Sequence, residues 1–169
     1  MSDVTIRPAD DADLPALTSA FGDETFFVDR LARQRAGRGQ LLTACLRDRP
    51  VGHVYVWWEE AEEREVQDFL PGIPLLNRVK VLPTYQNQGI GTELVLAAER
   101  LLANLGHKMV ALAVRYDNEG ARRLYKRLDY RIWDHPRVEC RYEVVRPDGT
   151  REHGFELCDM LVKDLTDSS

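Results

Sequence analysis

A strand, a short loop, two closely spaced glycines and a helix follow one another in residues 79–94, and this order constrains the fold most. The apolar strand ends before Pro83, and Gly89 and Gly91 precede the helix. The first N–H groups of such a helix lack partners within it, and the helix dipole favours an anion beside them. Glycine lets a ligand approach the backbone closely. The segment therefore predicts a phosphate-binding loop.

Two common phosphate loops fit this segment poorly. A P-loop ends in Gly-Lys-Ser/Thr, whereas Gly91 is followed directly by Thr92. A dinucleotide-binding loop needs a third glycine, and Leu94 occupies that position. The pattern Gln/Arg-x-x-Gly-x-Gly/Ala does fit residues 86–91, Gln-Asn-Gln-Gly-Ile-Gly. This segment resembles the pyrophosphate loop of the GNAT acyltransferase superfamily.

A second segment, about one βα unit downstream, resembles the same family. Residues 118–130, Asn-Glu-Gly-Ala-Arg-Arg-Leu-Tyr-Lys-Arg-Leu-Asp-Tyr, are similar to its Asn-x-x-Ala-x-x-Leu-Tyr-x-x-x-Gly-Phe segment. The pattern departs at Asp129-Tyr130, which affects the turn after the helix more than the site. The resemblance covers roughly residues 40–130. It implies one α/β (α+β) domain over residues 1–169, with a mixed, mostly antiparallel twisted sheet of about six to seven strands flanked by helices.

The composition excludes several functions. The chain has 169 residues, which is enough for one domain with a sizeable core, and a formal net charge of −5 at pH 7. It lacks the basic excess that usually marks a nucleic-acid-binding surface. No run approaches the ~20 apolar residues of a membrane span, and the N-terminus lacks the pattern of a signal peptide. We therefore expect a cytoplasmic protein with no nucleic-acid or membrane partner.

Cysteine and histidine form no metal or disulfide pattern. Cys45, Cys140 and Cys158 are far apart and include no Cys-x-x-Cys pair. Cys45 and Cys158 lie in strand-like runs, where buried apolar cysteines are common. His135 and His153 have no partners at metal-ligand spacing. We therefore expect no metal site.

Apolar periodicity and turn residues divide the chain into strands and helices. The predicted strands cover residues 4–8, 41–47, 51–58, 75–81, 109–114, 130–133, 141–145, 151–157 and 159–164. The predicted helices begin at Asp10 or Asp11, at Asp23, after Gly91 and at Asn118, and a polar loop is expected over residues 59–72. The segments 141–145 and 151–157 are expected to form an added hairpin around the turn at residues 147–150.

The resemblance implies an enzyme that transfers the acetyl group of acetyl-CoA to a primary amine of a small molecule or peptide, by direct attack in a ternary complex. In the family, the strand before the loop pairs with the pantetheine arm of the cofactor like another strand. The N–H of Val81 is then expected to donate to the thioester oxygen, as in an oxyanion hole. Carried over position by position, the cofactor-binding residues are Val79, Lys80, Val81, Gln86, Asn87, Gln88, Gly89, Ile90, Gly91, Thr92, Asn118, Ala121 and Tyr125.

Tyr125 is the expected catalytic residue, because it matches the family tyrosine near the cofactor sulfur. A phenol with a pKa of about 10 is able to protonate a departing thiolate whose thiol has a pKa of about 8.5. Tyr125 also lies on the apolar side of its helix with Ala121 and Leu128, where a tyrosine ordinarily packs in the core. Asn118 fits both a helix N-cap and the cofactor-contacting asparagine of the family, and the two roles are compatible.

The sequence leaves the general base and the acceptor site open. Many relatives carry a glutamate on the strand before the loop, but residues 75–81 contain no carboxylate. The alternatives for the base are Glu59, Glu60, Asp68, His53 and a relaying water. The acidic run over residues 59–68 is interpreted as a solvated loop or as an electrostatic funnel for a cationic amine. The candidates for lining the acceptor site are Phe27, Tyr55 and Trp57.

The same motifs are compatible with other functions. Transfer of a different acyl group is one alternative, because the motifs report coenzyme A and not the acyl chain. A non-catalytic acyl-CoA-binding or sensor module is another, because the strand before the loop lacks a carboxylate. Polyamines, aminoglycoside-like antibiotics, amino acids and protein N-termini are all candidate acceptors. Dimerisation is common in the resembled family, and the added hairpin near Asp148 is a candidate homodimer contact.

Overall fold

The computed structural model describes residues 3–59, 61, 64–133, 137–145, 148 and 150–165. Its strands are β1 (Val4–Pro8), β2 (Gly39–Leu46), β3 (Arg49–Trp57), β4 (Leu75–Val81), β5 (Met109–Arg115), β6 (Arg131–Ile132), β7 (Val138–Val145) and β8 (Arg151–Asp164). Its helices are α1 (Leu14–Phe21), α2 (Glu24–Arg35), α3 (Arg64–Phe69), α4 (Ile90–Asn104) and α5 (Glu119–Arg127). Short 3₁₀ turns lie at Asp11–Asp13 and Pro83–Tyr85.

The strands form one mixed sheet. Its order is β1-β2-β3-β4-β5-β8-β6, and β7 pairs with the first half of β8. The β4–β5 pair is parallel, whereas the other pairs are antiparallel. The predicted mixed, mostly antiparallel α/β sheet is therefore confirmed, with eight strands among the described residues where about six to seven were expected.

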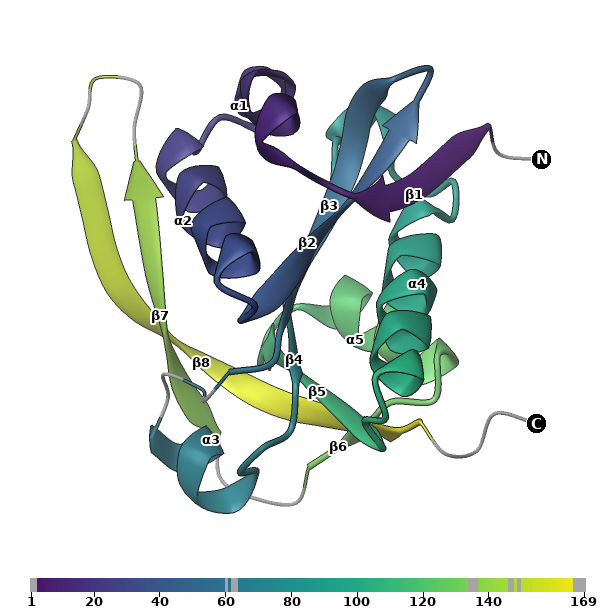
Figure 1. The fold of residues 1–169 in the computed structure, drawn as a ribbon. Helices are drawn as coiled ribbons and strands as arrows, with labels where there is room; N and C mark the ends of the chain where they lie inside the picture. Colours follow the sequence, from purple (N-terminus) through teal and green to yellow (C-terminus); the bar gives the residue numbers. More distant parts are fainter. Residues whose placement is uncertain are drawn as a thin grey trace.

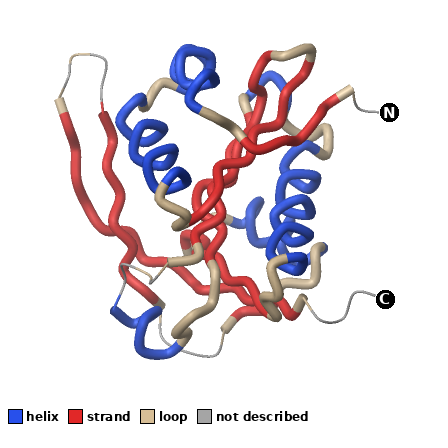
Figure 2. Tube along the Cα trace, in the orientation of Figure 1, coloured by secondary structure: helices blue, strands red, loops and turns tan. Residues whose placement is uncertain are grey.

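Helices cover both faces of the sheet (Figures 1 and 2). On one face, α1 and α2 pack over β2 and β3, and Leu17, Phe27 and Leu41 belong to one buried cluster there. On the other face, the apolar stripe of α4 packs against the sheet, with Leu94 and Ala98 fully buried. The chain from β4 through α4 to β5 is a parallel crossover, and this connection places the glycine loop at the end of β4.

The last strand is longer than predicted. Two separate strands, 151–157 and 159–164, were expected, but β8 runs unbroken from Arg151 to Asp164. Residues 151–158 pair with β7 and residues 158–164 pair with β5. The two sets of partners overlap at Cys158, so the backbone hydrogen bonding continues through the expected break. The prediction of two strands was therefore wrong, and the β7–β8 hairpin is a direct extension of the central sheet (Figure 1).

The polar loop expected over residues 59–72 contains the short helix α3. Val66 and Leu70, four residues apart, are both buried in a cluster with Ala111 and Val162. Burial of this small apolar pair stabilises a helical turn whose sequence is otherwise mostly polar. The prediction of a loop without secondary structure was therefore wrong, because a tertiary contact overrode the polar composition.

Replacing Gly39 by alanine is expected to lower the free energy of unfolding. A Cβ atom at this position in β2 would lie 2.2 Å from Tyr55 Oη and 2.5 Å from the carbonyl oxygen of Val56. Tyr55 is fully buried and Val56 is held in the sheet, so neither atom has room to retreat. We expect a loss of about 1–3 kcal/mol by urea denaturation. Gly120→Ala is the control, because its Cβ meets no atom closer than 3.8 Å, and it should leave stability unchanged or slightly raised.

Candidate active site

Strands β4 and β5 are paired at one end and open at the other. Their parallel register joins only Leu75 with Ala111 and Leu76 with Leu112. Beyond Leu76, β4 contains a bulge in which Arg78 and Val79 lie opposite one residue of β3. Arg78 has a φ of 55°, in the left-handed region. Since a bulge bends the strand that carries it, β4 turns away from β5 and a gap opens between them.

The edge of β4 that faces this gap offers backbone hydrogen-bonding groups. On the other edge, the N–H of Leu82 donates to the Val51 carbonyl at 2.9 Å, and Lys80 pairs with His53. Because alternate residues of a strand point their N–H groups to opposite edges, the N–H of Val81 points into the gap. An extended ligand arm is therefore able to pair with β4 in place of a strand.

The glycine loop ends where the gap opens. Gly89 is the N-cap of α4 with a φ of 84°, and no side chain caps this helix. The first intrahelical bond runs from the N–H of Glu93 to the carbonyl of Gly89. The N–H groups of residues 90–92 therefore have no intrahelical acceptor, and the loop residues 86–89 before them are exposed. This is the arrangement expected of a phosphate-binding loop, and it explains the glycine at position 89, where the left-handed conformation disfavours a side chain.

Helix α5 closes the gap from the side of α4. A cavity of about 290 Å³ lies between β4, β5 and α5, and Val79, Asn118, Ala121 and Tyr125 are among the residues that line it. The Asn118 side chain accepts a hydrogen bond from the N–H of Ala121 at 3.1 Å, so the predicted N-cap is confirmed. The structure thus brings four of the predicted site residues together, although they come from motifs about forty residues apart in the sequence.

Tyr125 is buried in the core and also lies in the wall of this cavity. The side chain is 7% exposed and packs edge-on against Tyr130, with 5.6 Å between the ring centroids. It also lines the cavity between β4, β5 and α5. Burial raises the pKa of Tyr125 to about 12, so the phenol keeps its proton throughout the neutral range. A protonated phenol in this position is a hydrogen-bond donor to any charge that develops in the cavity.

Three other predicted cofactor residues lie in β4, in the glycine loop and at the start of α4. Ile90 is buried in the core below α4, so its N–H alone is available to a ligand. Lys80 is exposed and pairs with His53 across the sheet, on the edge of β4 that faces away from the gap. Gln86 donates from Nε2 to the Val81 carbonyl at 3.1 Å and ties the loop to the end of β4.

The aromatic residues expected at the acceptor site lie in the core instead. Phe27, Tyr55 and Trp57 are 1%, 0% and 4% exposed and form one cluster between α2 and the sheet. Strand alternation turns Tyr55 and Trp57 inward on the same face, and α2 covers them. We therefore correct this prediction: the three side chains support α2 and do not line the cavity beside β5.

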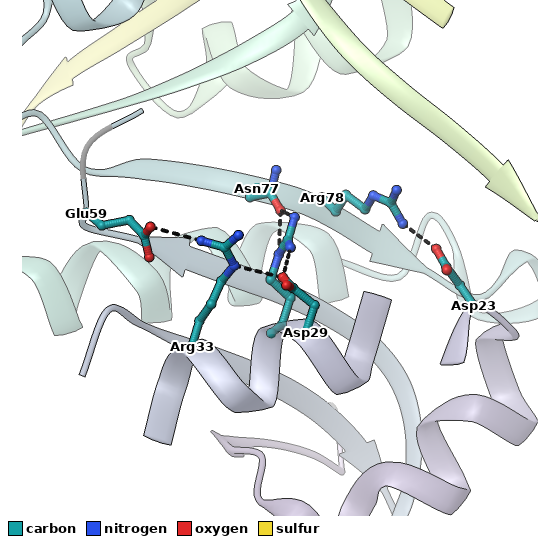
Figure 3. Close-up of polar contacts among 7 residues, drawn as sticks. Asp23, Asp29, Arg33, Glu59, Asn77 and Arg78 are labelled. Atoms are coloured by element: carbon teal, nitrogen blue, oxygen red, sulfur yellow. Dashed lines mark hydrogen bonds and ion pairs between the residues drawn. The ribbon is translucent and has the colours of Figure 1, made fainter. Parts of the chain in front are cut away.

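The positions of most of the candidate side chains argue against a role as the general base. Glu59 binds Arg33, with 2.9 Å between Oε1 and Nη1 (Figure 3). Asp68 is exposed on α3 and lies 3.8 Å from Arg64. Glu60 falls outside the described residues. His53 is buried among the rings of three phenylalanines, where no substrate has access.

His53 is expected to make stability depend on pH. Its pKa is lowered to about 3, chiefly because burial disfavours the charged ring, with repulsion from Lys80 and Arg78 adding to this. Between the ordinary value of 6.5 and about 3, the unfolded chain binds a proton that the folded protein does not. The free energy of unfolding should therefore decrease as the pH is lowered through this window, by up to about 1.4 kcal/mol per pH unit. Urea denaturation of His53→Phe should show a shallower fall, and equal slopes would contradict the assignment.

A second cavity opens on the opposite face of the same gap. It has a volume of about 270 Å³ between β4, β5, α3 and the β7–β8 hairpin. Its walls share Leu76, Arg78, Ala113, Arg115 and Glu156 with the first cavity, so the two spaces meet at one rim. Sequence reasoning missed these residues. The bulge that turns Arg78 outward has no sequence signature, and Glu156 lies in a strand that was assigned to an added hairpin.

A network of charged side chains fixes α2 beside this second cavity (Figure 3). The guanidinium of Arg30 donates from Nη2 to Asn77 Oδ1 at 2.9 Å and stacks on Phe26 at 4.6 Å. Arg78 binds Asp23 at 2.6 Å, and its guanidinium also lies 4.4 Å from the centre of the Phe26 ring. The α2 segment is thus joined to β4 just before the bulge, at Asn77, and within it, at Arg78, so both side chains have fixed positions.

Other classes of site find no support among the described residues. No group of three histidine, cysteine, aspartate or glutamate side chains there is arranged to hold a metal ion. Within the same part of the chain, no helix is long and apolar enough to cross a membrane.

Sequence comparison connects these features to known proteins. A family model for the Acetyltransferase (GNAT) family matches residues 7–130. A mycothiol acetyltransferase from Nocardiopsis dassonvillei is 40% identical over 73 residues, which are 43% of this chain and 21% of that protein. The chain therefore spans about a fifth of the length of this curated relative.

Solved structures share the fold. NAA60 from Arabidopsis thaliana, in complex with acetyl-CoA, has a TM-score of 0.71 and 21% sequence identity to this chain. The match covers 95% of this chain and 98% of the NAA60 chain. PaiA N-acetyltransferase from Thermoplasma acidophilum, in complex with coenzyme A, has a TM-score of 0.68 and 15% identity, with coverage of 97% and 99%. The matched residues of this chain include both motifs and strands β4 and β5. The chain belongs to the Acetyltransferase (GNAT) family.

Proposed function

We propose that the protein is an N-acetyltransferase that transfers the acetyl group of acetyl-CoA to the primary amine of a small molecule or peptide, within a ternary complex. One observation carries the proposal: the β4–β5 gap is entered by two cavities from opposite faces, with the glycine loop at one end and Tyr125 in its wall. Two substrates are thus able to meet at one point without displacing each other.

The hydrogen-bond donors among the described residues match the acceptor groups of coenzyme A. The N–H groups at the start of α4 bind the pyrophosphate, because they lack intrahelical partners and lie at the positive end of the helix dipole. The free edge of β4, at Val79 and Val81, pairs with the amide groups of the pantetheine arm. The N–H of Val81 then donates to the thioester oxygen and stabilises the negative charge that develops there.

Tyr125 acts on the leaving group in this proposal. Its phenol donates a hydrogen bond to the sulfur as the carbon–sulfur bond breaks, and burial keeps it protonated until then. A pKa of about 12 makes the phenol a weaker acid than a thiol, so complete transfer needs a source that reprotonates the tyrosine. The amine nitrogen, which becomes strongly acidic once it is acylated, is that source.

Titration calorimetry with acetyl-CoA, followed by an amine panel scored by free-thiol release, tests the proposal. We expect binding of acetyl-CoA and thiol release that depends on an added amine. If the protein fails to bind acetyl-CoA, the proposal is wrong at its first step. If it binds acetyl-CoA but no amine is acetylated, the protein is an acyl-CoA-binding module and not a transferase.

A further inference from the structure

We propose that the acceptor is a small molecule with a carboxylate near its amine, and that Glu156 takes the proton of this amine while Arg115 and Arg78 bind the carboxylate. The inference rests on the proposed acetyltransferase function and names the substrate class for the same site. It is carried by the cavity on the α2 face, whose lining at the rim of the β4–β5 gap includes one acidic residue, Glu156, and two arginines, Arg115 and Arg78.

The sheet register fixes the position of Glu156. Cys158 lies directly opposite Arg115 on β5, and side chains two apart on a strand share a face, so Glu156 lies on the face that Arg115 occupies. It is half-buried and lines both cavities. Among the described residues that line either cavity it is the one acidic side chain, and no described side chain forms an ion pair with it. A carboxylate in this position is available to an amine that enters from the α2 face.

The two arginines make the same rim selective for an anionic group. Arg115 is about half exposed and lies 2.9 Å from Asp117, a surface ion pair of the kind that contributes little and exchanges easily. Arg78 also lines both cavities, and Asp23 and the Phe26 ring hold its guanidinium in a fixed position. A guanidinium matches the two oxygens of a carboxylate. A polyamine would instead meet two positive charges and one negative charge.

The cavity limits the size of the acceptor. Its volume of about 270 Å³ lies just below the usual range for small-molecule sites and suits a molecule of amino-acid size. The rest of the lining is mainly apolar and includes Val66, Leu75 and Met160. The arrangement is therefore complementary to an amino acid. The amine of this ligand lies at Glu156, its carboxylate lies at Arg115 and Arg78, and its apolar side chain points toward α3.

The proton balance of the step is complete without a further reactant. The ammonium gives one proton to the Glu156 carboxylate, and the free amine forms a bond to the thioester carbon. The carbon–sulfur bond breaks, and the sulfur takes the proton of the Tyr125 phenol. The acylated nitrogen returns its second proton to Tyr125, and Glu156 releases its proton to water. The products are the amide, free coenzyme A and one proton.

The experiment compares each acceptor with its own uncharged counterpart. Common α-amino acids and short ω-amino acids are each assayed beside their carboxamides, with spermidine as a polyamine, after acetyl-CoA binding has been established by calorimetry. We expect at least one amino acid to exceed its carboxamide in kcat/KM by about 10- to 100-fold. If carboxamides or spermidine are equal or better, or if another amine reacts and no amino acid does, this substrate class is wrong, even though acetyl-CoA binding and the acetyltransferase assignment stand.

Matched variants separate the two roles. Arg115→Gln should raise the KM of the amino acid by about 10- to 100-fold and leave that of the carboxamide unchanged. Arg123→Gln, on the exposed side of α5, is the control for loss of a positive charge. Glu156→Gln should lower kcat by about 10²- to 10⁴-fold with the affinity for acetyl-CoA unchanged. Glu139→Gln is its control, because Glu139 pairs with Leu157 on the other face of the same hairpin. Equal effects in variant and control would overturn the assignment.

Discussion

Replacing Gly89 by tryptophan is expected to abolish measurable binding of acetyl-CoA. No atom lies within 4 Å of a Cβ built at this position, so the space in front of α4 is open to a ligand and an indole would occupy it. The ring would block the N–H groups that we assign to the pyrophosphate. Loss of two hydrogen bonds to a charged group, at about 1.5–3 kcal/mol each, corresponds to a weakening of at least about 100-fold. Titration calorimetry measures this directly.

Gly106→Trp is the matched control for this variant. Gly106 follows the other end of α4, has a φ of 90°, and also has open space around a Cβ. Both substitutions place an indole on a left-handed glycine at one end of the same helix, so their effects on stability should be similar. If both variants lose acetyl-CoA binding, or neither does, the glycine loop is not the phosphate site.

Replacing Tyr125 by phenylalanine should lower kcat by about 10²- to 10³-fold while the affinity for acetyl-CoA remains close to that of the unmodified protein. The phenyl ring keeps the packing against Tyr130, and the loss is confined to the hydroxyl group in the cavity. A fall in rate at constant affinity means that the hydroxyl interacts more strongly in the transition state than in the ground state. Steady-state kinetics and calorimetry on the same preparation give the two numbers.

Tyr116→Phe tests whether any lost tyrosine hydroxyl has this effect. Tyr116 is 44% exposed, just after β5, and lines neither cavity of the β4–β5 gap. The kcat of the Tyr116→Phe variant should equal that of the unmodified protein. If Tyr125→Phe retains full activity, the phenol has no role in the leaving-group step, and Tyr125 is then a core residue of the kind that its helix periodicity also predicted.

The sequence was sufficient for the parts of the site that depend on backbone geometry. The left-handed Gly89, the N-cap at Asn118 and the strand before the loop all follow from local rules that act over a few residues. These features were predictable because each one is stabilised by its neighbours in the chain.

The acceptor side was not predictable because it depends on register and on tertiary burial. Phe27, Tyr55 and Trp57 have the residue types of a binding surface, but α2 covers them. Arg78 belongs to the site because the bulge in β4 turns it toward Phe26. Glu156 reaches the rim because β8 does not break at Cys158. Each of these facts requires knowledge of which strands lie side by side.

The continuity of β8 has a consequence for how this site tolerates insertions and deletions. Between Glu156 and Met160 the strand crosses from the hairpin into the buried sheet, with one register along its whole length. Adding or removing a single residue there would invert the alternation and move the carboxylate to the opposite face. A change of two residues would preserve the face but shift the carboxylate along the strand by about 7 Å. In this segment, the number of residues therefore determines where the carboxylate lies as strictly as residue identity determines that a carboxylate is present.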